Sequence, residues 1–273
     1  MNARPIFNWP LQSDSRPSSY SRITVALTTL SFIIGGCSAV SPSSHMPTLI
    51  EQDPHPSLAL QGKISQASQQ KLQVGLAFVP EVVQSHPPTT LSKDSLERFT
   101  ARTKSALENK VPLDIQDVVR LETLQPGKSV KQLQGIGKDE DFEFVIVIMT
   151  SSDEVTTPAY LDASAPDVGI LPGNEIQNYA LVEVALVDLQ SGKSLIQAHG
   201  RSYALLEQLD VPIESNRYPL VKGSANGNRF YPTDDMALEV LRTVALEEAL
   251  DQAIMKFDIE WRETITAPSH RRS

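Results

Sequence analysis

The eight residues FEFVIVIM, at positions 142–149, constrain the fold more than any other part of the sequence. Seven of them are apolar and four are β-branched, which favours a strand buried on both faces. A second stretch, KLQVGLAFVP at positions 71–80, has large apolar residues at period two and small or apolar residues between them. Two such strands belong in the middle of a sheet that is covered on both sides.

The first helix is expected after Ser92, a residue type that favours the N-cap position, and it runs to Lys110 with apolar residues at three- and four-residue steps. A weaker strand is predicted over residues 117–124, followed by a short helix that Gly137 ends.

The C-terminal half predicts a hairpin and a long helix. Residues 179–189 and 194–204 flank a turn in which Gly192 supplies a positive backbone φ angle. Thr233 is expected to cap a helix that continues to about residue 265. Its apolar stripe consists of Leu246, Leu250, Ile254, Phe257 and Trp261. Its acidic residues predicted to face solvent are Glu247, Glu248, Asp251 and Glu260.

This order of elements predicts one α/β domain over residues 71–265, with a mixed β-sheet covered by two longer helices and one short helix. The C-terminal hairpin and long helix form one unit of it. Residues 151–177 and 206–232 read as long irregular loops, which are uncommon unless they bind something or are disordered.

Residues 1–37 have the pattern of a cleaved export signal. Arg4, Arg16 and Arg22 give a net positive leader, and residues 23–36 are apolar without a charge. Fourteen residues of helix span roughly 21 Å, well short of the ~30 Å hydrocarbon core, so a permanent spanning helix is disfavoured.

Cys37, the only cysteine, follows Ile34, Gly35 and Gly36 at the end of the apolar run. This arrangement resembles the lipobox of bacterial lipoproteins, which implies cleavage before Cys37 and acylation of its thiol. The acyl chains would anchor the protein to a membrane. Ser38 follows the cysteine, which by the same resemblance favours the outer membrane, with the domain facing the periplasm and surface exposure left open. The alternative is a buried cysteine on an ordinary helix.

Residues 38–70 are rich in Ser, Pro and Gln and are predicted to be a flexible tether, of which residues 38–68 are expected to be dispensable for folding. Within it, Thr48, Leu49 and Ile50 are candidates for docking on the domain. Residues 266–273, TAPSHRRS, form a basic tail.

The chain carries 24 basic and 33 acidic side chains, and removal of residues 1–37 leaves a net charge of −11. Such an acidic chain without a basic patch is repelled by phosphate backbones, so nucleic acid is excluded as an expected partner. With Cys37 acylated no thiol remains for a disulfide, so stability must come from a packed core.

Four segments together resemble the rhombotarget lipoprotein family over residues 37–263: KLQVGLAFVPE, FEFVIVIMT, ILPGNE and ALVEVALVDLQSGKSLIQAHGRS. More distantly, the arrangement is similar to the periplasmic α/β domain of the curli-secretion lipoprotein and of the lipoprotein activators of penicillin-binding proteins. These resemblances imply a domain that binds or assembles. Some rhombotarget relatives end in an apolar helix and a basic cluster, whereas this tail has no apolar segment.

The sequence predicts no catalytic centre, metal site or cofactor. His199 is the one histidine on a predicted strand, and Arg201 on the same face would depress its pKa. Asp139, Glu140 and Asp141 are consecutive and therefore point in different directions, as expected for a solvated loop before a strand.

The predicted function is therefore that of a membrane-anchored binding, adaptor or assembly module, whose partner is an envelope protein or another copy of itself. The candidate partner-binding residues are the apolar and aromatic residues of the two predicted loops: Tyr160, Ile170, Leu171, Tyr218, Phe230 and Tyr231. Core cover is the alternative for these residues. The alternative functions are a hydrolase that uses loop carboxylates and a subunit of an oligomeric secretion-type assembly, the latter disfavoured by Pro158, Pro166 and Pro172.

Overall fold

A computed structural model describes residues 42–53, 62, 71–80, 91–125, 127–140, 142–162, 169–211, 217–225 and 227–266. The strands are β1 Leu72–Val79, β2 Leu113–Arg120, β3 Phe144–Asp162, β4 Ile170–Asp188, β5 Ser194–Leu209, β6 Leu220–Gly223 and β7 Arg229–Phe230. The helices are α1 Met46–Leu49, α3 Lys93–Lys110, α4 Ser129–Glu140, the 3₁₀ turn η1 Asp234–Met236 and α5 Ala237–Thr266.

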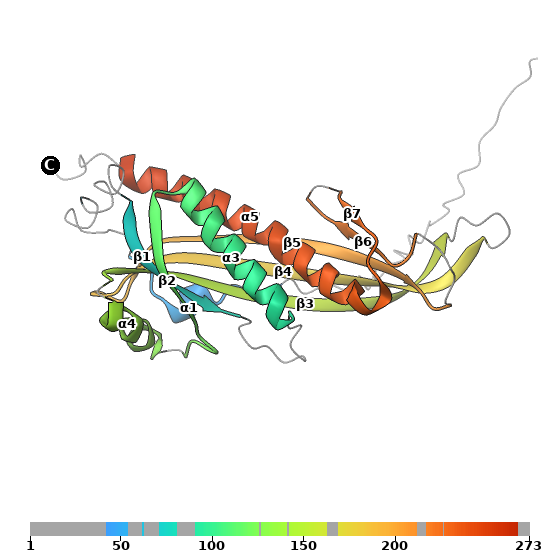
Figure 1. Ribbon diagram of the computed structural model, residues 1–273, viewed down its shortest axis with the longest axis horizontal. Helices are drawn as coiled ribbons and strands as arrows, with labels where there is room; N and C mark the ends of the chain where they lie inside the picture. Colours follow the sequence, from blue (N-terminus) through green and yellow to red (C-terminus); the bar gives the residue numbers. More distant parts are fainter. Residues whose placement is uncertain are drawn as a thin grey trace, which may run out of the picture. The chain divides into compact units, whose positions relative to one another are not determined.

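The seven strands form one mixed sheet in the order β2-β1-β3-β4-β5-β6-β7 (Figure 1). Strand β1 runs parallel to both β2 and β3, and every other neighbouring pair is antiparallel. The predicted α/β class and mixed sheet are confirmed.

The sheet is covered on both faces, as the two apolar strands predict. Val74, Leu76 and Phe78 of β1 face a core shared with α3 and α5, whereas Ala77 and Val79 face a second core under α1 and α4. Strand β1 lies between two neighbours, which explains why it is apolar on both sides.

Several predicted local signals are confirmed. The Ser92 hydroxyl accepts a hydrogen bond from the Ser95 amide at 3.2 Å and caps α3. Gly192 has a φ angle of 73° in the turn between β4 and β5. The predicted apolar stripe of α5 is buried from Leu246 to Trp261.

Three predicted element ends are wrong. Strand β2 is Leu113–Arg120 rather than residues 117–124. Its pairing with β1 begins at Leu113, directly after the bend that follows α3. Helix α4 continues through Gly137 to Glu140, so this glycine does not end it and Asp139 and Glu140 are helical. Thr233 precedes η1 without a side-chain capping bond.

The predicted solvent position of Glu248 is also wrong. Its carboxylate is buried and accepts hydrogen bonds from the Ser202 hydroxyl, the Ser224 hydroxyl and amide, and the Ala225 amide, at 2.8–3.0 Å. Four donors satisfy the charge, which allows it to lie under the β6–β7 turn. Glu248 therefore fastens this turn to α5.

The two long loops predicted from the sequence are largely strands. Residues 151–162 extend β3 and residues 170–177 begin β4, in an antiparallel register that pairs Ser151 with Leu181 and Asp162 with Ile170. In the second segment β5 continues to Leu209, and β6 and β7 follow.

Two prolines that argued against a hairpin lie inside these strands. β1 pairs with β3 only as far as Met149, so beyond that point β3 has a free edge within the described residues, and Pro158 lies on it. A proline is tolerated at a sheet edge because no ladder bond is required of it there. Pro158 and Pro172 therefore do not prevent an extended hairpin, and Pro166 lies outside the described residues.

Part of the predicted tether, residues 42–53, is packed against the sheet and requires a correction. Met46, Leu49 and Ile50 are buried in the second core, which confirms docking at Leu49 and Ile50. The buried carboxylate of Glu183 on β4 accepts hydrogen bonds from the Ser44 hydroxyl and from the His45 and Met46 amides at 3.0 and 3.1 Å. This segment contributes apolar surface to the core, so we now expect its removal to lower the stability of the domain.

We expect Glu183→Ala to lower the free energy of unfolding by about 2 kcal/mol, because hydrogen bonds to a charged group are worth ~1.5–3 kcal/mol and the donors would stay buried. Urea denaturation followed by Trp261 fluorescence measures this loss. Glu175→Ala is the matched control on the same strand and face, where the half-buried carboxylate holds no segment among the residues that the structure describes. Equal stability of the two variants would show that the docked segment does not depend on Glu183.

Cys37 and the lipobox residues Ile34, Gly35 and Gly36 lie outside the described residues. Within the described ranges, no helix combines the length and the apolar character that crossing a bilayer requires.

Candidate functional site

A pocket of about 590 Å³ lies where the parallel strands β1 and β2 reach their carboxyl ends and β3 continues beyond its pairing with β1. Its polar lining residues are Arg120, Glu122, Thr150, Ser151 and Ser152. Its apolar lining residues are Phe78, Pro80, Leu91, Leu96, Phe99 and Leu246. The carboxyl edge of parallel strands is where open α/β sheets bind ligands, and the volume lies in the usual range for small-molecule sites.

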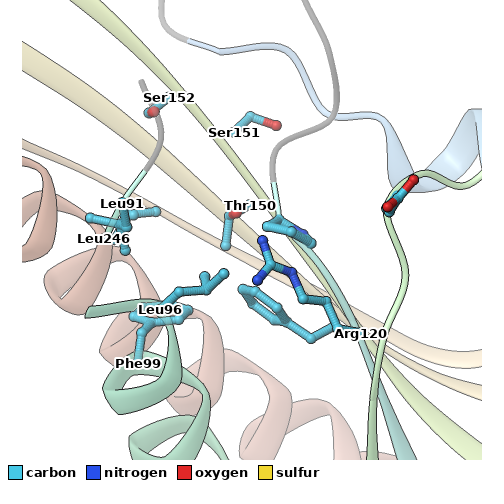
Figure 2. Close-up of a pocket in the computed structure, with 11 residues that line it drawn as sticks. Leu91, Leu96, Phe99, Arg120, Thr150, Ser151, Ser152 and Leu246 are labelled. Atoms are coloured by element: carbon cyan, nitrogen blue, oxygen red, sulfur yellow. The ribbon is translucent and has the colours of Figure 1, made fainter. Parts of the chain in front are cut away.

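Strand pairing brings the polar and apolar parts of the pocket together. Arg120 is the register partner of Phe78, so both side chains leave the sheet on the face that carries α3 and α5. Figure 2 shows the Arg120 guanidinium reaching toward Thr150, with Leu96, Phe99 and Leu246 on the other side of the pocket. The pocket therefore combines one cation with an apolar wall.

The wall is rigid because α3 and α5 are tied together beside it. The carboxylate of Glu239 on α5 accepts hydrogen bonds from the Ser92 and Ser95 hydroxyls at the start of α3, and these bonds lower the pKa of Glu239 below its ordinary value. Further along, Arg102 forms ion pairs with Glu247 and with Asp251, the latter at 3.0 Å. These contacts fix the first half of α3 against α5.

Among the described residues that line the pocket, Glu122 is the one carboxylate and there is no histidine. His199 lies on β5 opposite Glu183, and its pKa is lowered by burial first and then by Lys256 and Arg201. The predicted effect of Arg201 is therefore present, although burial is the larger cause. Among the described residues no group of three His, Cys, Asp or Glu side chains is placed to hold a metal ion.

The six predicted partner-binding residues do not form a single surface. Tyr160 and Ile170 are 83% and 69% exposed and are diagonal neighbours on one face of the β3–β4 hairpin. Leu171 lies on the opposite face, half-buried and paired with the buried Leu161. Figure 1 shows β3 and β4 continuing beyond the start of α5, so this end of the hairpin has no helix over it.

The remaining three predicted residues lie around β6 and β7. Phe230 and Tyr231 are exposed, and Phe230 pairs with Val221 on the sheet face that carries α5. Tyr218 is half-buried and donates a hydrogen bond from its hydroxyl to the Asp162 carbonyl oxygen at 3.1 Å. Tyr218 therefore holds the end of β3, and Tyr160, Ile170, Phe230 and Tyr231 are the candidates that remain open to a partner.

Sequence reasoning missed the pocket, although its parts were visible. Arg120 and Glu122 were included in a predicted strand over residues 117–124, whereas β2 ends at Arg120. The signal that could have indicated the pocket was Arg120, a charged residue at the carboxyl end of a strand that runs parallel to a buried strand.

No family model matches the chain, and no curated protein matches it. Among solved structures, a neuraminyllactose-binding hemagglutinin homolog from Helicobacter pylori is similar at 10% identity, over 72% of this chain and 90% of that one, with a TM-score of 0.36. The lipoprotein GNA1162 from Neisseria meningitidis is similar at 13% identity, over 57% and 87%, with a TM-score of 0.26. The hypothetical protein CT253 from Chlamydia trachomatis is similar at 10% identity, over 69% and 98%, with a TM-score of 0.30. Likeness at this level carries no inference about function.

Proposed function

We propose that this chain is a lipoprotein of the bacterial cell envelope, anchored through acylated Cys37 and acting by binding rather than by catalysis. The lipobox resemblance of residues 34–37 and the resemblance of residues 37–263 to the rhombotarget lipoprotein family support the anchor and its outer-membrane, periplasm-facing location. The acidic composition suits a soluble domain that does not bind nucleic acid.

The observation that carries the binding proposal is the exposure of Tyr160 and Ile170 side by side on the β3–β4 hairpin. The backbone beneath them is fixed by a continuous register of 19 residues on each strand, so little conformational entropy is lost when a partner binds. Aromatic residues on a rigid support are typical anchors of protein interfaces. The partner is an envelope protein or a second copy of this chain.

The test is site-specific photo-crosslinking of the full chain in native envelopes. A photoreactive amino acid at position 160 should give a discrete adduct with the partner or with a second copy, whereas one at Met255, which is 57% exposed on α5, should not. Tyr160→Ala with Ile170→Ala should reduce crosslinking from a neighbouring position and leave the melting temperature nearly unchanged, since both side chains are exposed.

Cys37→Ala should release the protein from the membrane fraction and abolish the adduct. Indistinguishable adduct patterns from positions 160 and 255 would refute the hairpin as the binding surface. Membrane-bound wild-type protein with an unmodified Cys37 would refute the anchor.

A further inference from the structure

Two opposite charges enter the pocket from one short stretch of chain. Arg120 ends β2 and Glu122 follows two residues later, and both line the cavity. Among the described residues, neither side chain forms an ion pair or a hydrogen bond, with the other or with a third group. The rest of the α3–α5 face is different, since Arg102 and Arg242 there are both paired with carboxylates.

These charges lie beside an apolar wall. Leu96 and Phe99 from α3 and Leu246 from α5 form this wall, and all three belong to the main core. A charge next to apolar surface is stabilised when it gains a partner of opposite sign that also donates or accepts hydrogen bonds. The pocket thus has two charged groups, Arg120 and Glu122, that a ligand could satisfy.

We propose that this pocket binds an amphipathic zwitterion, namely an apolar amino acid or a short apolar peptide with free termini. The ligand's carboxylate pairs with Arg120, whose planar guanidinium suits bidentate binding of a carboxylate. Its ammonium group pairs with Glu122, and its apolar side chains pack against Leu96, Phe99 and Leu246. A purely anionic amphiphile would be repelled by Glu122, and a purely cationic one by Arg120. This site goes beyond the proposed function, because it does not involve the hairpin surface.

The test is isothermal titration of the purified full chain in detergent with four probes: leucine, Leu-Leu, N-acetyl-Leu-Leu and Leu-Leu-amide. Saturable binding of Leu-Leu or leucine is expected, and the tighter of the two identifies the size of the natural ligand. Blocking the carboxylate should weaken binding about tenfold and blocking the amine about threefold, since the planar guanidinium of Arg120 can bind a carboxylate through two hydrogen bonds at once.

Two charge-removing variants locate each end of the ligand. Arg120→Gln should bind Leu-Leu and Leu-Leu-amide equally, and Glu122→Gln should bind Leu-Leu and N-acetyl-Leu-Leu equally. Arg229→Gln, an exposed arginine on β7, is the matched control and should leave all affinities unchanged. Both pocket residues are exposed, so melting temperatures should stay within about 1 °C of the wild type.

Three outcomes would overturn the proposal. One is the absence of saturable binding of both leucine and Leu-Leu. Another is equal affinity of the wild type for the free and the blocked peptides, which would leave only an apolar site. The third is a preference for free termini that survives in both Arg120→Gln and Glu122→Gln, which would place the ligand elsewhere. None of these outcomes depends on crosslinking at the hairpin.

Discussion

Replacement of Gly200 by alanine is expected to lower the free energy of unfolding by about 3 kcal/mol or more, near the upper limit of what overpacking usually costs. A methyl group on this residue of β5 would lie 1.9 Å from the Ala249 carbonyl oxygen and 2.5 Å from the Ala253 amide nitrogen of α5. Both atoms belong to the helix backbone, so no side chain can move aside. Helix α5 would have to shift away from the sheet, with loss of close packing along its length.

The matched control is Gly135→Ala in α4, where an added methyl group meets no atom within 4 Å. This variant should gain about 0.5–1 kcal/mol, because alanine is the better helix former. Urea denaturation of both variants, followed by circular dichroism, gives the comparison. A loss below about 1 kcal/mol for Gly200→Ala would mean that the contact between α5 and β5 is looser than the structure describes.

Phe257→Ala is expected to cost about 3–5 kcal/mol, the usual range for a fully buried phenylalanine. The Phe257 side chain has no exposed surface, and its ring centroid lies 6.3 Å from that of Trp261 on the same helix. Its removal would leave a cavity between α5 and the sheet. The near-ultraviolet signal of Trp261 should weaken in the same variant, because this signal depends on fixed packing around the indole.

Met255→Ala is the control for Phe257→Ala, since Met255 lies two residues away on the solvent side of α5 and is 57% exposed. Its cost should stay within about 0.5 kcal/mol. Comparable losses for the two variants would place the buried face of α5 elsewhere.

The central part of this fold was predictable because its signals are local and strong. Strand β1 is apolar on both faces, and a strand of this kind has few stable positions other than between two neighbours under two helical layers. Phe78, Val145 and Val147 of the two apolar strands and Leu250 and Phe257 of the predicted apolar stripe are all buried, although the two valines face the second core rather than α5.

The outer half of the sheet was not predictable by the same means. Residues 151–157 of β3 are mostly Ser, Thr, Asp and Glu, residue types that composition assigns to loops. Their strand conformation depends on pairing with β4 and on distant contacts such as the bidentate ion pair between Glu154 and Arg242 of α5. A sequence window cannot show a partner that lies 88 residues away.

The candidate sites differ in the same way: local sequence signals predicted one of them, and the other depends on long-range contacts. Tyr160 and Ile170 stood out because large apolar side chains among polar ones are visible in a sequence. The pocket depends on the register between β1 and β2 and on the approach of α3 to α5, neither of which is encoded within one segment. Leu171 was predicted with its neighbours but faces away from them, because successive residues of a strand alternate between faces.

The docking of residues 42–53 on the sheet shortens the tether and therefore limits how far the domain can move from its membrane anchor. Under the proposed anchor, Ser44 is seven residues after Cys37, and seven residues of fully extended chain span at most about 25 Å. A tether of all thirty-three residues from 38 to 70 would have allowed several times that distance. Because the effective concentration of two tethered molecules falls as their linkers lengthen, the short connection favours encounters with proteins held in the same membrane over encounters with proteins at a distance.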